Sequence, residues 1–142
     1  MTIQVFNGSH KISTSEDLFT RTSQCVAVGM VDSTQNLAGV VQIHFRSDHE
    51  RMLSALIEGL MAIDGHQANY RLGVGGGVDT FVPGYGFIPG GHNADRVIEY
   101  LTKNGFENAI SEGVVDIYTD YIRNLFAYTS KRELEIKRLK IK

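Results

Sequence analysis

The stretch CVAVGMVDSTQNLAGVVQIHF, residues 25–45, decides the fold of this 142-residue chain. It contains two almost entirely apolar, β-rich runs, residues 25–31 and 37–45, with turn-forming residues between them. Short apolar runs bounded by turn residues are typical of buried strands. The sequence therefore predicts a buried β-hairpin that Cys25 opens and that His44 nearly closes.

Helical periodicity follows this hairpin. Apolar residues recur at i, i+3, i+4 and i+7, which predicts a helix over about residues 48–64. Ser47 and Glu50 stand in capping-box spacing at its start. The apolar face carries Met52, Leu53, Leu56, Ile57, Leu60 and Met61.

A second helix is expected after Asn93, ending at Gly105, a residue suited to the left-handed position past a helix end. Its buried side carries Val97, Ile98 and Leu101. Between the two helices, residues 73–91 hold eight of the fifteen glycines and both prolines. This segment is too apolar for a linker, so it predicts a short strand with a folded or functional loop. Its glycines favour a tight bend or a close approach of one backbone to another.

The two ends of the chain are predicted to add strands. Residues 2–6 alternate weakly and favour a short edge strand, and the polar residues 7–16 favour a loop. Near the C-terminus, residues 114–118, 121–128 and 133–139 each favour a strand. Basic and acidic side chains mix in the last of these, as on the solvated face of an edge strand.

Length and composition indicate one globular domain over residues 1–142. The formal net charge of -2 argues against a nucleic-acid partner, since phosphate binding needs a cationic surface. We expect no membrane span, no signal peptide and a cytoplasmic location. A single cysteine excludes an intrachain disulfide and a multi-cysteine zinc site, and no nucleotide-binding fingerprint is present, so no metal or cofactor is expected.

Cys25 and His44 are the sharpest candidate pair for chemistry. A thiol is a nucleophile only as thiolate, and a neighbouring imidazole can take its proton. A turn centred near Gln35 places Cys25 opposite position 44 or 45 of the second strand. From spacing alone the alternative reading is stronger, in which both residues serve packing and hydrogen bonding in the sheet.

Taken together, the segments resemble the chemoreceptor glutamine deamidases called CheD. CVAVGMVD and the Gly39 to His44 strand are similar to that family's GSCVAV and GG-x-x-H-x-x patterns. GGVDTF, IPGGHNADRVIEYLTKNG and LEIKRL resemble its later motifs GGANMF, IG-x-x-N and LVKRL, in the same order. The resemblance covers about residues 20–139, nearly the whole chain.

The resemblance implies an α/β (α+β) fold, a sandwich of mixed β-sheets with two main helices packed outside, shared with the cytotoxic necrotizing factor toxins. It implies a cysteine-dependent deamidase with Cys25 as nucleophile, His44 as base and a threonine that completes the site. The family places that threonine six residues before the cysteine, where this chain has Phe19. Thr20 is the preferred candidate and Thr22 the alternative.

One departure from the family pattern lies beside the nucleophile, where Ser23 and Gln24 replace its Gly-Ser. This change leaves a second reading open, a catalytically silent scaffold that binds a signalling partner such as a phosphatase. The expected partner of the enzyme reading is a glutamine-bearing protein substrate. Neither reading requires a cofactor.

Overall fold

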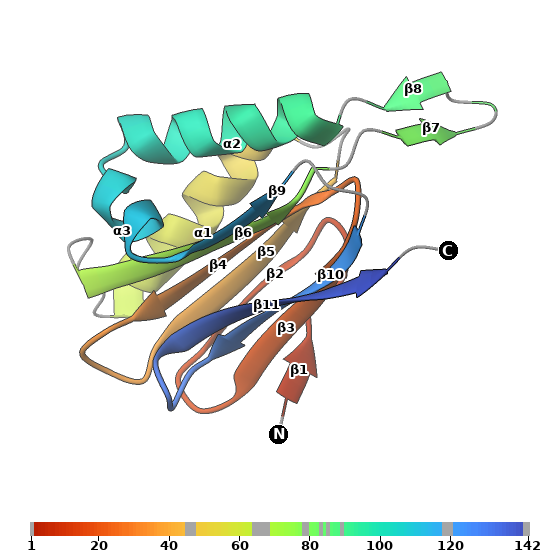
Figure 1. The fold of residues 1–142 in the computed structure, drawn as a ribbon. Coiled ribbons are helices and arrows are strands. Elements are labelled where there is room, and N and C mark those ends of the chain that lie inside the picture. Colours follow the sequence, from red (N-terminus) through yellow and green to blue (C-terminus); the bar gives the residue numbers. More distant parts are fainter. Residues whose placement is uncertain are drawn as a thin grey trace.

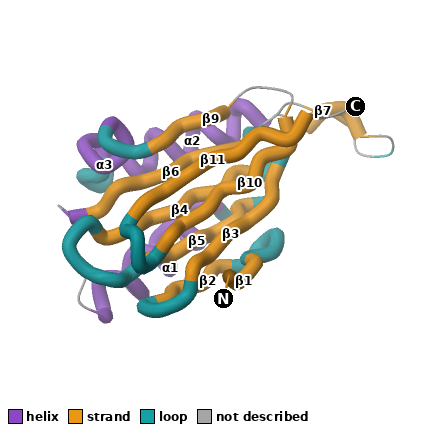
Figure 2. Tube along the Cα trace, turned by 60° about the horizontal axis from the view of Figure 1, so that its bottom comes forward, coloured by secondary structure: helices purple, strands orange, loops and turns teal. Residues whose placement is uncertain are grey.

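The computed structural model describes residues 2–44, 48–63, 69–77, 80–82, 84, 86–88, 90–117 and 121–140. Two β-sheets lie face to face, and the helices cover the outer face of only one of them (Figures 1 and 2). A two-stranded hairpin projects from one end. The predicted sandwich with helices outside is therefore confirmed, with both main helices on the same side.

Three groups of elements make up the molecule. The sheet beneath the helices has the order β2 (His10–Ser13), β5 (Ala38–Ile43), β4 (Val26–Asp32), β6 (Tyr70–Gly76) and β9 (Val114–Ile117). The second sheet has the order β1 (Thr2–Gln4), β3 (Asp17–Thr22), β10 (Tyr121–Tyr128) and β11 (Glu133–Lys140). The remaining elements are the β7 (Thr80–Val82) and β8 (Gly86–Ile88) hairpin and the helices α1 (His49–Ile63), α2 (Gly90–Lys103) and α3 (Glu107–Ser111).

Both large sheets are mixed. In the four-stranded sheet β1 runs parallel to β3, and in the five-stranded sheet β6 runs parallel to β9. The other described pairs of both sheets are antiparallel, including the predicted hairpin of β4 and β5. No helix in the described part of the chain is both long enough and apolar enough to span a membrane.

Strand β4 separates two apolar cores, because its successive side chains point to opposite faces. Val28 and Met30 belong to the core beneath the helices, which α1 and α2 close. Ala27 and Val31 belong to the core between the sheets. Small residues on that inner face let the second sheet approach: a Cβ added at Gly29 would lie 2.6 Å from Leu125 Cδ2.

Several boundaries differ from the sequence predictions. Residues 10–13, predicted as loop, form the edge strand β2. This strand contains only one large apolar residue, so its sequence shows no alternation of apolar and polar residues. The five-residue helix α3 was not predicted because it is shorter than two helical turns. Helix α2 begins at Gly90, before Asn93.

The first helix begins as predicted, but with a different cap. The Asp48 side chain accepts a hydrogen bond from the Arg51 backbone N–H at 3.2 Å, so Asp48 occupies the N-cap position. Ser47 of the expected capping box lies outside the described residues, as does Asp64 at the predicted end of the helix. At the end of α2, Gly105 has φ +89°, the left-handed conformation predicted for it.

Candidate functional site

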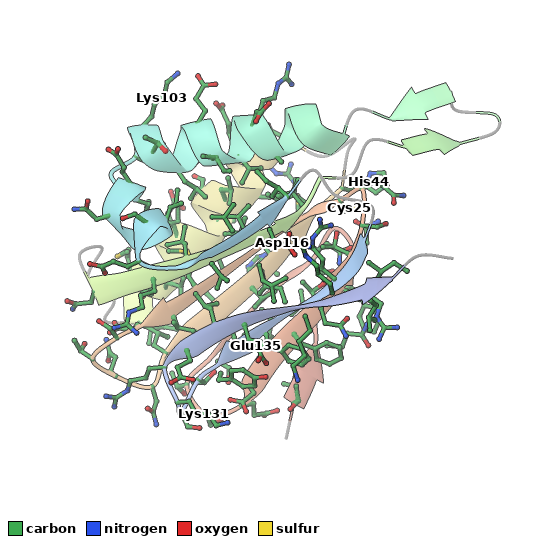
Figure 3. All side chains as sticks on the ribbon, in the orientation of Figure 1. Cys25, His44, Lys103, Asp116, Lys131 and Glu135 are labelled. Carbon is green, nitrogen blue, oxygen red and sulfur yellow. The ribbon has the colours of Figure 1, made fainter. Side chains whose placement is uncertain are left out.

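The register of the β4–β5 hairpin, continued by one position, relates Cys25 to His44. Each pair of the ladder, from Val26 with Ile43 to Val31 with Ala38, has residue numbers that sum to 69. The next position therefore sets Cys25 opposite His44. Figure 3 shows both residues at the same end of the sandwich.

Alternation along the two strands also assigns both residues to one face. Ala27, two positions after Cys25, lies in the core between the sheets. Gln42, two positions before His44, reaches across to β3. Cys25 and His44 therefore share the face of the sheet that points toward the four-stranded sheet. The Cys25 side chain is buried and that of His44 is half-buried.

A surface pocket of about 290 Å³ opens beside the thiol. Its wall is formed by Asn7, Arg21, Thr22, Ser23, Gln24, Cys25, Gln42 and Ile122. Cys25 is 8% exposed, and its Sγ lies 3.6 Å from Asn7 Oδ1. Cys25 therefore belongs to the wall of a surface pocket while remaining largely shielded from solvent.

Two hydrogen bonds fix the backbone carbonyl of Cys25. The carbonyl oxygen accepts hydrogen bonds from Thr22 Oγ1 at 2.6 Å and from the Gly77 N–H at 3.2 Å. Gly76 has φ +98°, and a Cβ there would lie 2.0 Å from that oxygen. Only glycine fits, which confirms the close backbone approach predicted for this glycine-rich run.

Thr20 and Thr22 both point between the sheets, but they have different partners. Thr20 is fully buried; its hydroxyl donates to Val5 O at 2.6 Å and accepts from Gln42 Nε2 at 2.6 Å. Gln42 Nε2 also donates to the carbonyl of Arg21 at 2.7 Å. Thr20 therefore links the segment that follows β1 to β3 and β5, whereas Thr22 contacts Cys25 directly.

The two residues that depart from the family pattern bond to each other. Ser23 Oγ donates a hydrogen bond to Gln24 Oε1 at 2.5 Å, and both side chains line the pocket. They form the bend that leads from β3 to Cys25. The altered pair thus shapes the pocket wall next to the sulfur.

Sequence reasoning gave no role to three polar residues of the pocket, Asn7, Arg21 and Gln42. Asn7 was assigned to a loop without a role, although Asn-Gly at residues 7 and 8 is a strong turn signal. Gln42 interrupts the apolar run of β5, and a polar residue inside such a run indicates a buried hydrogen bond.

A cluster of charged side chains from β9, β10 and β11 lies at the same end, and one of its members is fully buried. Arg123 is fully buried, stands opposite Thr22 in the β3–β10 register, and places its Nε 3.2 Å from Asp116 Oδ2. Arg138 adds two hydrogen bonds to the same carboxylate, at 2.7 and 2.6 Å. The hydrogen bonds from Arg138, with the charge of Arg123, hold the pKa of Asp116 below its usual value, although burial acts in the opposite direction.

The described residues contain no group of three or more His, Cys, Asp and Glu side chains that could hold a metal ion. His49, at the start of α1, packs edge-on against Tyr100 of α2, with ring centroids 6.4 Å apart.

Comparisons with known proteins give a distant structural likeness. No protein-family model matches the sequence, and no curated protein matches it. Among solved structures, the Neisseria meningitidis protein NMB0706, assigned to family DUF152, superposes with a TM-score of 0.49 at 12% sequence identity. The match covers 78% of this chain and 52% of that one, so the chain spans about half the length of this relative.

Proposed function

We propose that the protein is a cysteine-dependent amidohydrolase that deamidates glutamine side chains of a protein substrate. The observation that carries the proposal is the hairpin register, which sets Cys25 opposite His44 on one face, beside a pocket open to solvent. The order of motifs resembling the CheD family supports the same chemistry. Cys25, His44 and a threonine, Thr20 or Thr22, are the proposed site residues.

The proposed reaction has two halves. His44 takes the proton of the Cys25 thiol, and the thiolate attacks the carboxamide carbon to form a tetrahedral oxyanion. The oxyanion collapses, the C–N bond breaks, and His44 returns the proton to the departing ammonia. Water, deprotonated by His44, then breaks the C–S bond of the thioester, which leaves a glutamate side chain and the thiol.

Mass spectrometry tests this proposal. Glutamine-bearing candidate proteins incubated with the enzyme should gain about one mass unit per modified site, as expected when a carboxamide becomes a carboxylic acid through a covalent intermediate. Incubation with Cys25→Ala is the matched control and should give no gain. A gain of equal size with both proteins would contradict a role for Cys25.

The two threonines make different predictions. Thr20→Val should slow deamidation by about ten- to a hundredfold, because the hydroxyl that anchors Gln42 beside His44 is lost. Thr22→Val removes the hydroxyl that holds the Cys25 carbonyl and serves as the comparison. Steady-state rates and urea unfolding of both variants are the measurements.

If Thr22→Val is the damaging change and Thr20→Val is silent, the third site residue is Thr22. If neither change affects the rate, the site lacks a third member and the scaffold reading gains support.

One observation favours that second function, a catalytically silent binding scaffold. The Ser23–Gln24 pair, absent from the resembling family, occupies the pocket wall beside Cys25. Alkylation separates the two readings, because a catalytic thiol should react much faster in the folded protein than a buried structural one. A Cys25 thiol that resists alkylation until the protein unfolds would support the scaffold.

A further inference from the structure

The turn that joins β1 to β2 brings a carboxamide to the sulfur of Cys25. Asn7 lies in this turn, and the Cys25 thiol donates its hydrogen bond to Asn7 Oδ1 over 3.6 Å. Both residues line the same solvent-open pocket. The proposed nucleophile is therefore already in contact with an amide group of the kind it is proposed to attack.

The backbone fixes Asn7 in this position. The Ser9 N–H donates to Phe6 O at 3.0 Å and closes a four-residue turn. Gly8, the third residue of that turn, has φ +77°, as a type II turn requires there. The Gly8 N–H also donates to Gln42 O at 3.0 Å, which ties the turn to β5. Asn7 is thus presented at the pocket by a braced turn, although its own side chain is exposed.

We infer that Asn7 recognises the primary carboxamide of the substrate, an inference that rests on the proposed amidohydrolase function. An asparagine side chain offers one acceptor oxygen and an NH₂ donor, the same pair that a glutamine side chain presents. When substrate enters and the thiol proton moves to His44, Asn7 Oδ1 accepts from the substrate NH₂ and Asn7 Nδ2 donates to the substrate oxygen. A carboxylate product cannot supply the NH₂ donor, so Asn7 favours substrate over product.

Amide recognition and a purely structural role require different chemical groups at position 7. A residue that only held the Cys25 thiol would need just an acceptor, which aspartate also supplies. Recognition of a carboxamide needs the acceptor and the donor together. Asn7→Ala removes both groups, and a ratio of two alkylation rates cancels any change in the thiolate fraction, so a lost preference reports amide recognition. Because Asn7 is exposed, this change removes no core packing.

The test compares alkylation by iodoacetamide and by iodoacetate, two reagents that differ in carrying a carboxamide or a carboxylate. Cys25 is the only cysteine, so every alkylation event reports on this site. The ratio of the two rates is measured for the folded protein and divided by the same ratio for the urea-unfolded chain. For the native protein we expect a normalised preference for iodoacetamide of about tenfold, the size of one net hydrogen bond.

The variants give the expected pattern. Asn7→Ala should reduce the normalised preference to about one, and Asn36→Ala, at the turn end of the same hairpin, should leave it unchanged. Asn7→Asp is not judged by this ratio, because its carboxylate repels iodoacetate and raises the ratio through charge alone. Its alkylation profile should move to higher pH, because a carboxylate beside the sulfur opposes thiolate formation.

An undiminished preference in Asn7→Ala would overturn the inference. The proposed hydrolase function can fail separately from the role of Asn7. If the preference for iodoacetamide depends on Asn7 but the protein deamidates no candidate substrate, amide recognition is supported and the hydrolase is contradicted. Deamidation that is unaffected by Asn7→Ala supports the hydrolase and contradicts the role of Asn7.

Discussion

Replacing His44 with alanine should reduce deamidation by about a thousandfold or more, and Cys25→Ser should have an effect at least as large. Without His44 no base opposite Cys25 takes the thiol proton, and a serine hydroxyl is a far weaker nucleophile than a thiolate. Initial rates of glutamine deamidation, followed by mass, measure the loss.

Stability is the control for these two variants. Both residues lie just beyond the ends of their strands, so we expect the free energy of unfolding to change by about 1 kcal/mol or less and the transition to stay cooperative. Urea unfolding gives this quantity. A parallel loss of activity and stability would instead assign Cys25 and His44 a structural role.

Asp116→Asn should destabilise the protein by about 3 kcal/mol at neutral pH. The substitution keeps the shape of the side chain but leaves the charge of Arg123, whose side chain is fully buried, without its carboxylate. Removing one partner of a buried ion pair is costly for this reason. Arg138→Gln is the matched control, with an expected cost of about 1 kcal/mol or less, because the Arg138 side chain is 49% exposed.

The difference between wild type and Asp116→Asn should depend on pH. The pKa of Asp116 is lower in the folded protein than its ordinary value of 3.8, so its contribution is fully present above that value. The contribution is lost as the pH falls through the lower, folded pKa. Urea unfolding at neutral and at strongly acidic pH measures both limits, and an equal difference at the two would contradict the assignment.

The local pattern of apolar and polar residues was sufficient to identify the β4–β5 hairpin and the helix that follows it. The runs around Val28 and Val41 are buried on both faces, and their length and composition indicate strands without further context. The turn between them predicted the register closely enough to set Cys25 against position 44 or 45, and the observed ladder, in which Val26 pairs with Ile43, points to 44 when continued by one position. The long helix α1 carries enough apolar repeats to be unmistakable.

The remaining parts depend on contacts between distant segments, which no local pattern contains. Strand β3 pairs with the distant strand β10, and Thr22 lies opposite Arg123 in this pairing. Arg123 sits at an inward position among the alternating residues of β10, yet nothing nearby in sequence indicates that Asp116 compensates its charge. Asn7 meets Cys25 only because the β1–β2 turn is tied to β5.

The two walls of the pocket also have different folding histories. The pair Cys25 and His44 comes from one hairpin, whereas the opposite wall needs β3 to meet β10, a contact such as Arg21 with Asn124 that joins residues 103 positions apart. Local contacts form faster than distant ones. We therefore expect a refolding chain to assemble its proposed nucleophile and base before it encloses them. During that interval the thiol is open to oxidation, so refolding yield should rise in a reducing solution.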